Sequence, residues 1–110
     1  MLNRSAVAVK AKQPFLDWLN SVERSDSLTL DKLEKTLYLI PDYEDPEEVE
    51  ELLKQGYEGI FNRELFAWYT DKKRWPKDRS FKVFKAWFDV ECFDEVVDIV
   101  AGPIVDTLYD

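Results

Sequence analysis

The stretch DPEEVEELLKQGYEGIFNRELFAW, residues 45–68, predicts the longest helix of the chain. Asp45 is a favoured helix cap, and Pro46 fits the first helical position because its missing N–H would be unpaired there anyway. The acids that follow face the positive end of the helix dipole. Apolar residues then recur every three or four positions, as on one face of a helix. They are Val49, Leu52, Leu53, Tyr57, Ile60, Phe61, Leu65 and Trp68.

Two strands and one helix are expected before this long helix. Residues 4–10 alternate weakly and are rich in small and β-branched side chains, which predicts a first strand. A helix then begins at Gln13-Pro14 and shows the same three-or-four spacing of apolar residues. Residues 36–41 form a short apolar run that ends at a proline. Such a run is typical of a strand covered on both faces.

The C-terminal part predicts one more helix and one more strand. Asp78 or Ser80 caps the helix, and residues 90–100 form the strand. The resulting order is strand, helix, strand, helix, helix, strand. Helices packed on one layer of strands would bury these apolar faces most simply. We therefore expect a single α+β domain over residues 1–110, with a small, mostly antiparallel sheet of about three strands.

The bulk composition is that of a folded domain from a reducing compartment. The chain has 110 residues, of which 45% are hydrophobic and 15% aromatic. This is enough to bury a core without a disulfide or a metal. Its single cysteine, Cys92, cannot form an internal disulfide. No signal peptide is recognisable, and no window approaches the ~20 apolar residues of a membrane span. We expect a cytoplasmic protein that does not enter a membrane.

Acidic and basic residues are separated along the chain. The net charge is −8; residues 42–51 hold seven acids, whereas residues 71–85 hold seven bases and two acids. A protein this acidic is repelled on average by nucleic acids and by anionic membranes. The expected partner is therefore another protein rather than a nucleic acid.

The segment WYTDKKRWPKDR, residues 68–79, interleaves bases with aromatic side chains and is the candidate partner-binding surface. Three interpretations remain open. The tryptophans could anchor the loop while its bases pair with the acidic region; the loop could dock a protein; or it could stack on single-stranded nucleic acid. The residues assigned to partner binding are Trp68, Tyr69, Lys72, Lys73, Arg74, Trp75, Lys77 and Arg79.

The sequence contains no constellation that indicates a reaction. It has no histidine, which removes the usual general base near neutral pH, Cys–His pairs and most zinc sites. The phosphate-binding motif GxxxxGK[ST] and the dinucleotide-binding motif GxGxxG are both absent from the sequence. Cys92 has acidic neighbours and is interpreted as a small buried hydrophobe. The acids of residues 89–98 lack calcium-loop spacing and are interpreted as solubilising charge. We assign no catalytic, cofactor-binding or metal-binding residue.

The function that these features favour is a non-catalytic, cytosolic protein-interaction domain. It would act through the basic and aromatic loop 68–79 and through the acidic helix face. One alternative is a small enzyme that uses paired carboxylates, with Tyr69 or Lys73 as helpers. Another is a self-assembling homo-oligomer in which the acidic and basic regions of different copies meet.

Six short segments also occur in a familiar order over nearly the whole chain. They are NRSAV (3–7), KQPFLDWL (12–19), YLIP (38–41), WYTD (68–71), WPKDRS (75–80) and FKAWFDVE (84–91). In this order they resemble an uncharacterised family of small acidic bacterial proteins. The resemblance implies a bacterial origin and no particular reaction, because the shared motifs consist of packing and capping residues.

Overall fold

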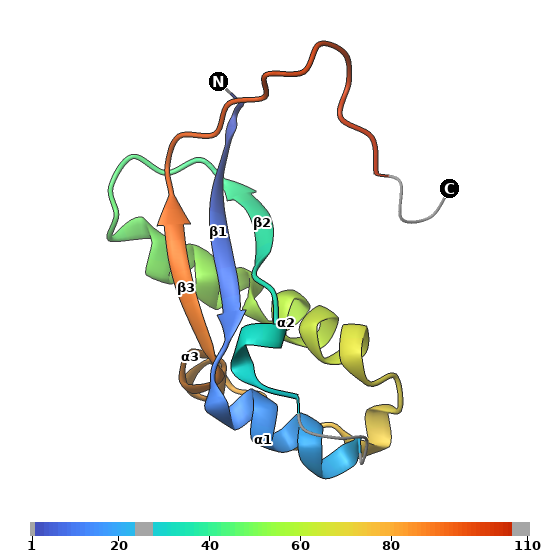
Figure 1. Ribbon diagram of the computed structural model, residues 1–110. Coiled ribbons are helices and arrows are strands. Elements are labelled where there is room, and N and C mark those ends of the chain that lie inside the picture. Colours follow the sequence, from blue (N-terminus) through green and yellow to red (C-terminus); the bar gives the residue numbers. More distant parts are fainter. Residues whose placement is uncertain (1, 24–27, 107–110) are drawn as a thin grey trace.

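The computed structural model describes residues 2–23 and 28–106, which form a small α+β fold (Figure 1). A three-stranded antiparallel sheet carries three α-helices, as the sequence predicted. The order of strands and helices is also the predicted one. Along the chain the elements are β1 (Arg4–Ala11), α1 (Gln13–Val22), η1 (Leu30–Lys32), β2 (Thr36–Pro41), α2 (Glu48–Trp68), η2 (Lys72–Arg74), α3 (Phe81–Trp87) and β3 (Phe88–Phe93).

The first strand of the chain is the central strand of the sheet. The order is β2-β1-β3, and β1 runs antiparallel to both neighbours. Val7 of β1 lies opposite Tyr38 of β2 and Cys92 of β3. Because side chains alternate between the faces of a sheet, Val7 and Val9 point to the same side, where both are fully buried in the core.

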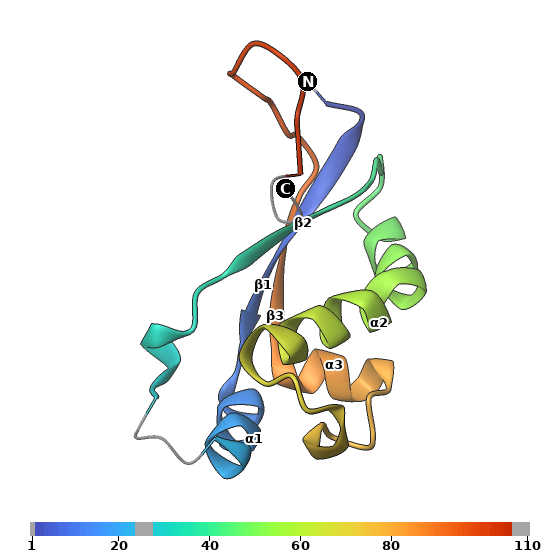
Figure 2. The same ribbon diagram turned by 90° about the vertical axis from the view of Figure 1, so that its right-hand side faces the viewer.

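The helices gather on one side of the sheet, which creates one core and leaves the other side open. Figure 2 shows α2 and α3 together on one side of the three strands. Phe61 of α2, Phe84 of α3 and Phe88 meet there, with ring centroids 5.3–6.0 Å apart. Phe15 of α1 closes the core near the end of β1, 5.4 Å from the Phe88 ring. Such tilted and edge-to-face pairs contribute about 0.5–1.5 kcal/mol beyond the area that they bury.

The start of α2 is fixed by carboxylates. The helix spans Glu48–Trp68, so the prediction for 46–68 is confirmed to within two residues. Glu48 Oε2 accepts hydrogen bonds from the backbone N–H groups of Glu44 (3.1 Å) and Asp45 (3.4 Å). These bonds tie the preceding turn to the first helical turn, where negative charge is favoured by the helix dipole.

The start of α3 is fixed by Ser80, which settles the choice between the two predicted caps. Its Oγ accepts a hydrogen bond from the backbone N–H of Val83 at 3.3 Å. Asp78 acts one step earlier, since its Oδ1 accepts from the N–H of Ser80 at 3.1 Å.

Within residues 2–23 and 28–106, no helix has the length and apolarity needed to span a membrane.

One face of β2 is exposed, so the prediction of a strand covered on both faces was wrong. Tyr38 and Ile40 pack against the core, whereas Leu37 and Leu39 are 59% and 49% exposed on the open side of the sheet. The sequence run is apolar on both faces of the strand, and this hides the alternation that normally marks a half-exposed strand. Its edge position in a one-layer sheet explains the difference.

The third strand is shorter and begins earlier than predicted: it spans Phe88–Phe93 instead of residues 90–100. It follows α3 without a loop and pairs with β1 from Ala11 opposite Phe88 to Ala6 opposite Phe93. A strand persists only where it has a partner for its backbone groups. Because β1 begins at Arg4, residues beyond 93 have little strand left to pair with.

Candidate functional site

The segment 68–79 is named the cationic loop here, and it joins the end of α2 to the start of α3. Its backbone is held by aspartates. Asp71 Oδ1 accepts a hydrogen bond from the N–H of Lys73 at 3.0 Å, at the start of η2. Asp78 holds the far end of the loop through Ser80, and Arg79 Nη1 donates to the carbonyl oxygen of Pro76 at 2.6 Å. The loop therefore has a defined conformation rather than a free one.

Trp75 anchors the cationic loop to the domain. Its side chain is only 8% exposed, and its Nε1 donates to the carbonyl oxygen of Tyr69 at 2.8 Å. Trp18 of α1 adds a second tie, because its Nε1 donates to the carbonyl oxygen of Arg74 at 2.9 Å. Of the aromatic residues assigned to partner binding, Trp75 is thus an internal support. Tyr69 is half-buried, and Trp68 is 40% exposed.

The five bases of the cationic loop all lie at the surface around this anchor. They are Lys72, Lys73, Arg74, Lys77 and Arg79. Two of them flank the Trp75 ring, with Lys72 Nζ 5.8 Å and Arg79 Cζ 5.7 Å from its centroid. Within residues 2–23 and 28–106, no ion pair joins any of the five to a carboxylate. The loop therefore presents an unneutralised positive surface on a rigid support.

The acidic helix face lies too far away to neutralise these bases. Its acids lie in residues 42–51, at the start of α2, whereas the cationic loop follows the end of α2. A helix of 21 residues is on the order of 30 Å long, and an ion pair requires contact within ~4 Å. One acid of this face, Glu50, binds Lys85 of α3 at 2.9 Å. The interpretation in which the loop bases pair with the acidic face is therefore wrong.

A buried carboxylate beside the cationic loop was missed by the sequence reasoning. Glu64 of α2 is 7% exposed, and its Oε2 accepts a hydrogen bond from the Tyr38 hydroxyl of β2. Arg63 Nη1 lies 3.6 Å from the same oxygen and donates to the Tyr38 hydroxyl at 3.3 Å. A signal existed in the sequence, because Glu64 occupies a position in the apolar register between Phe61 and Leu65.

Burial and the Glu64 carboxylate keep the Tyr38 hydroxyl protonated. Burial contributes most to raising the pKa of Tyr38, and the hydrogen bond and negative charge of Glu64 raise it further. Arg63 acts in the opposite direction and lowers this pKa. The three side chains form a polar cluster around the buried Glu64 carboxylate, with Tyr38 half-buried and Arg63 exposed. The cluster ties the edge strand β2 to the middle of α2, at the cost of bringing a carboxylate out of water.

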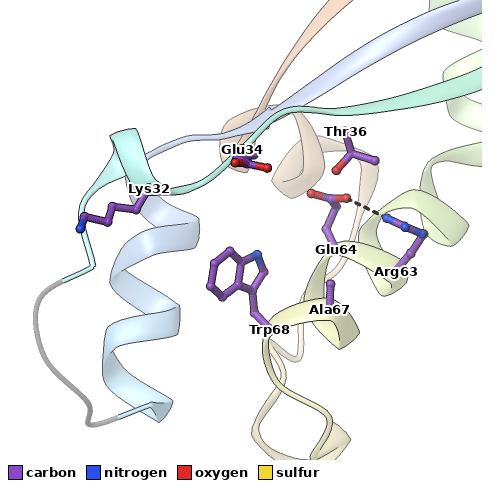
Figure 3. Close-up of a pocket in the computed structure, with 7 residues that line it drawn as sticks. All are labelled: Lys32, Glu34, Thr36, Arg63, Glu64, Ala67 and Trp68. Carbon is purple, nitrogen blue, oxygen red and sulfur yellow. Dashed lines mark ion pairs between the residues drawn. The ribbon is translucent and has the colours of Figure 1, made fainter.

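A pocket of about 300 Å³ opens above this cluster (Figure 3). Glu34 and Trp68 border it, and the Arg63–Glu64 ion pair lies in its wall. The remaining lining residues are Lys32, Thr36 and Ala67. Two carboxylates thus share one concavity, but Glu64 is already bound to Tyr38 and Arg63. Neither Tyr69 nor Lys73, the helpers expected for a carboxylate enzyme, lines this pocket.

Cys92 is exposed, so its interpretation as a buried hydrophobe was wrong. It lies on β3 opposite Val7, and partial burial raises the pKa of its thiol. Tyr43 is close enough for the Cys92 and Asp94 charges to raise the pKa of its phenol, after a larger contribution from burial. Within the two described ranges, no group of three or more acidic, cysteine or histidine side chains is placed to hold a metal ion.

Comparison with known proteins adds no evidence of function to this geometry. No family model, no curated protein and no solved structure matches the chain. The resemblance to small acidic bacterial proteins therefore stays a prediction from sequence. The candidate site rests on the chemistry of the cationic loop and its surroundings alone.

Proposed function

We propose that this protein is a non-catalytic, cytoplasmic protein-interaction domain that binds an acidic surface of another protein through its cationic loop. The observation that carries the proposal is the unpaired state of the five loop bases around a buried tryptophan. The single cysteine supports a reducing compartment. The chain otherwise carries an excess of acids, so a cluster of unpaired bases stands apart from the rest of its surface.

Rigid support of the bases favours binding. Lysine and arginine side chains lose conformational freedom when they bind, and association is weakened by that ordering. Here the backbone beneath them is already fixed by Asp71, Asp78 and Trp75. Less ordering is needed than for a mobile loop. Charge complementarity then steers and orients the acidic partner, while Trp68 and Tyr69 supply aromatic surface of the kind found at interface centres.

A protein partner fits the charge pattern better than a nucleic acid does. The net charge of −8 opposes approach of a polyanion that extends beyond the loop. An acidic patch on a folded protein can contact the loop locally and avoid the acidic face at the other end of α2. The acidic region of one copy of this chain could also contact the cationic loop of another copy. In the co-purification below, this homo-oligomer would appear as capture of the untagged chain itself.

The test is a tagged co-purification from the native host, with nuclease present, read by mass spectrometry. The variant reverses three loop charges, Lys72→Glu, Lys73→Glu and Arg74→Glu. The expected result is a stoichiometric partner that the wild type captures and the variant loses. The captured partner is expected to carry an acidic surface, and capture is expected to weaken as salt rises.

A matched control separates the loop from net charge. The variant Arg4→Glu, Lys54→Glu, Lys82→Glu changes the charge by the same amount at exposed positions outside the cationic loop and the pocket beside it. It should retain the partner. Equal capture by the loop variant and the wild type, with both folded by circular dichroism, would contradict the proposal. Capture that depends on nucleic acid, removed by nuclease in the wild type, would contradict it as well.

A further inference from the structure

The open face of the sheet carries a second surface, unrelated to the cationic loop. Leu39 of β2 and Phe93 of β3 lie on either side of Ala6 of β1, in one row across the three strands. Leu39 is 49% exposed, and Phe93 is 41% exposed. Val7 and Val9 face α2 and α3, so this row points to the opposite side of the sheet, away from α2 and α3 in Figure 2. Large apolar side chains gathered on an uncovered sheet face indicate an interaction site.

The next rows of this face carry charge, arranged asymmetrically. Leu37 of β2 and Glu91 of β3 lie on either side of Ala8. Asp89 lies opposite Lys10 in the row beyond. The β3 side of the face is thus acidic, whereas the β2 side is apolar and begins at Lys35, the residue that precedes the strand. Between them lies a hollow of about 230 Å³ over Ala8, lined by Lys10, Lys35, Asp89 and Glu91 as well.

We propose that the open face binds a second copy of this chain, sheet against sheet, about a two-fold axis parallel to the strands. This rotation lays β2 of each copy over β3 of the other while keeping the rows aligned. Leu39 then packs on Phe93 of the second copy. Leu37 enters the hollow beside Ala8 of the second copy.

Charge selects this axis over the other face-to-face arrangement. With the axis parallel to the strands, Lys35 meets the acidic β3 edge of the second copy, at Asp89 and Glu91. With the axis perpendicular to the strands, β3 of one copy would lie over β3 of the second copy, so the acidic side chains of the two strands would face each other. Lys10 does not oppose the first arrangement, because its Nζ is drawn toward β2 by a hydrogen bond to the carbonyl oxygen of Leu33 at 3.2 Å.

The dimer is expected to be weak. Three strands spaced ~4.8 Å apart and three rows along them cover roughly 300 Å² on each copy, and stable interfaces bury about 800 Å² on each. Association should therefore depend on protein concentration. It does not require the cationic loop, so failure of one proposal leaves the other standing.

The experiment is sedimentation velocity of the full chain from about 10 µM to about 1 mM. The wild type should shift from monomer toward dimer across this range. The variant Leu37→Lys, Leu39→Lys should stay monomeric, with an apparent dissociation constant at least about tenfold higher. A control variant, Gln55→Lys, Phe66→Lys, adds the same charge at exposed positions of α2, on the other side of the sheet, and should dimerise as the wild type does.

A charge swap tests the axis. Lys35→Glu alone and Glu91→Lys alone should each weaken the dimer by about threefold to tenfold, because the two-fold axis repeats every contact. The double variant should restore association to near the wild-type level. A wild type that remains monomeric at 1 mM would overturn the proposal, as would unaltered dimerisation of the Leu37→Lys, Leu39→Lys variant. Additive weakening in the double variant would overturn the assigned axis.

Discussion

The polar cluster around Glu64 and the cationic loop lie next to each other, yet the protein treats their charges in opposite ways. In the cluster, the Glu64 carboxylate is bound by Tyr38 and lies beside Arg63 inside the domain. In the loop, five bases stand at the surface with no carboxylate partner among residues 2–23 and 28–106. Charge that a chain pairs internally serves its own structure, whereas charge that it holds unpaired on a rigid support is available to another molecule.

The anchor of the cationic loop should show the largest effect on stability. Trp75→Ala removes a buried ring, leaves a cavity and frees the carbonyl oxygen of Tyr69. We expect a loss of about 3 kcal/mol or more in the free energy of unfolding, measured by urea denaturation. The matched control is Trp68→Ala, at the half-exposed tryptophan, which should lose less than about half as much. Equal losses for both would show that Trp75 does not anchor the loop.

Removal of the buried Glu64 carboxylate should cause the second largest loss of stability. Glu64→Ala leaves the half-buried Tyr38 hydroxyl and Arg63 without the partner that both contact, and should lower the free energy of unfolding by about 2 kcal/mol. Glu58→Ala, at an exposed position of the same helix, should change it by less than about 0.5 kcal/mol. If the two variants have the same stability, the polar cluster contributes nothing to holding β2 on α2.

Alkaline pH should lower the stability that the Tyr38 hydroxyl contributes to the polar cluster around Glu64. The pKa of Tyr38 is raised above 10 in the folded protein, so the unfolded chain loses this proton first as the pH rises. Stability from this group is thus complete below pH 10 and falls above it. Tyr38→Phe should abolish this part of the alkaline loss, whereas Tyr57→Phe should retain it. Thermal unfolding between pH 9 and pH 11.5 measures the difference, and identical pH profiles would contradict it.

The sequence predicted the elements of this fold better than their environments. Periodicity predicted α2 and the capping pattern predicted the start of α3 at Asp78 or Ser80, because both depend on residues close together in the chain. The predicted cap of α2, Asp45, instead accepts a hydrogen bond from the N–H of Glu47, the residue before the helix. Burial depends on the neighbours of each strand, which explains the errors at β2 and at Cys92. The length of β3 was set by the length of β1, eighty residues earlier in the chain, and no local pattern could reveal that limit.

The candidate site was predicted in composition but not in organisation. The bases and aromatic residues of 68–79 were evident from the sequence, whereas the division of labour between them was not. Trp75 is buried, with its Nε1 donating to the carbonyl oxygen of Tyr69, whereas Trp68 lines a pocket at the surface. Glu64 was overlooked, although it lies in the apolar register of α2 between Phe61 and Leu65.

The smallest effect on stability should come with the largest effect on binding, and this contrast tests the central claim most directly. The measurement is isothermal titration of the captured partner into the wild type, into the Lys72→Glu, Lys73→Glu, Arg74→Glu variant and into the matched Arg4→Glu, Lys54→Glu, Lys82→Glu control, at low and moderate salt. Since no carboxylate among residues 2–23 and 28–106 pairs with the loop bases and only Lys72 of the three contacts the Trp75 ring, reversal should change the free energy of unfolding by less than about 1 kcal/mol. Binding should be lost in the loop variant alone and should weaken with salt in the wild type. Equal affinity for the wild type and the folded loop variant would contradict the account.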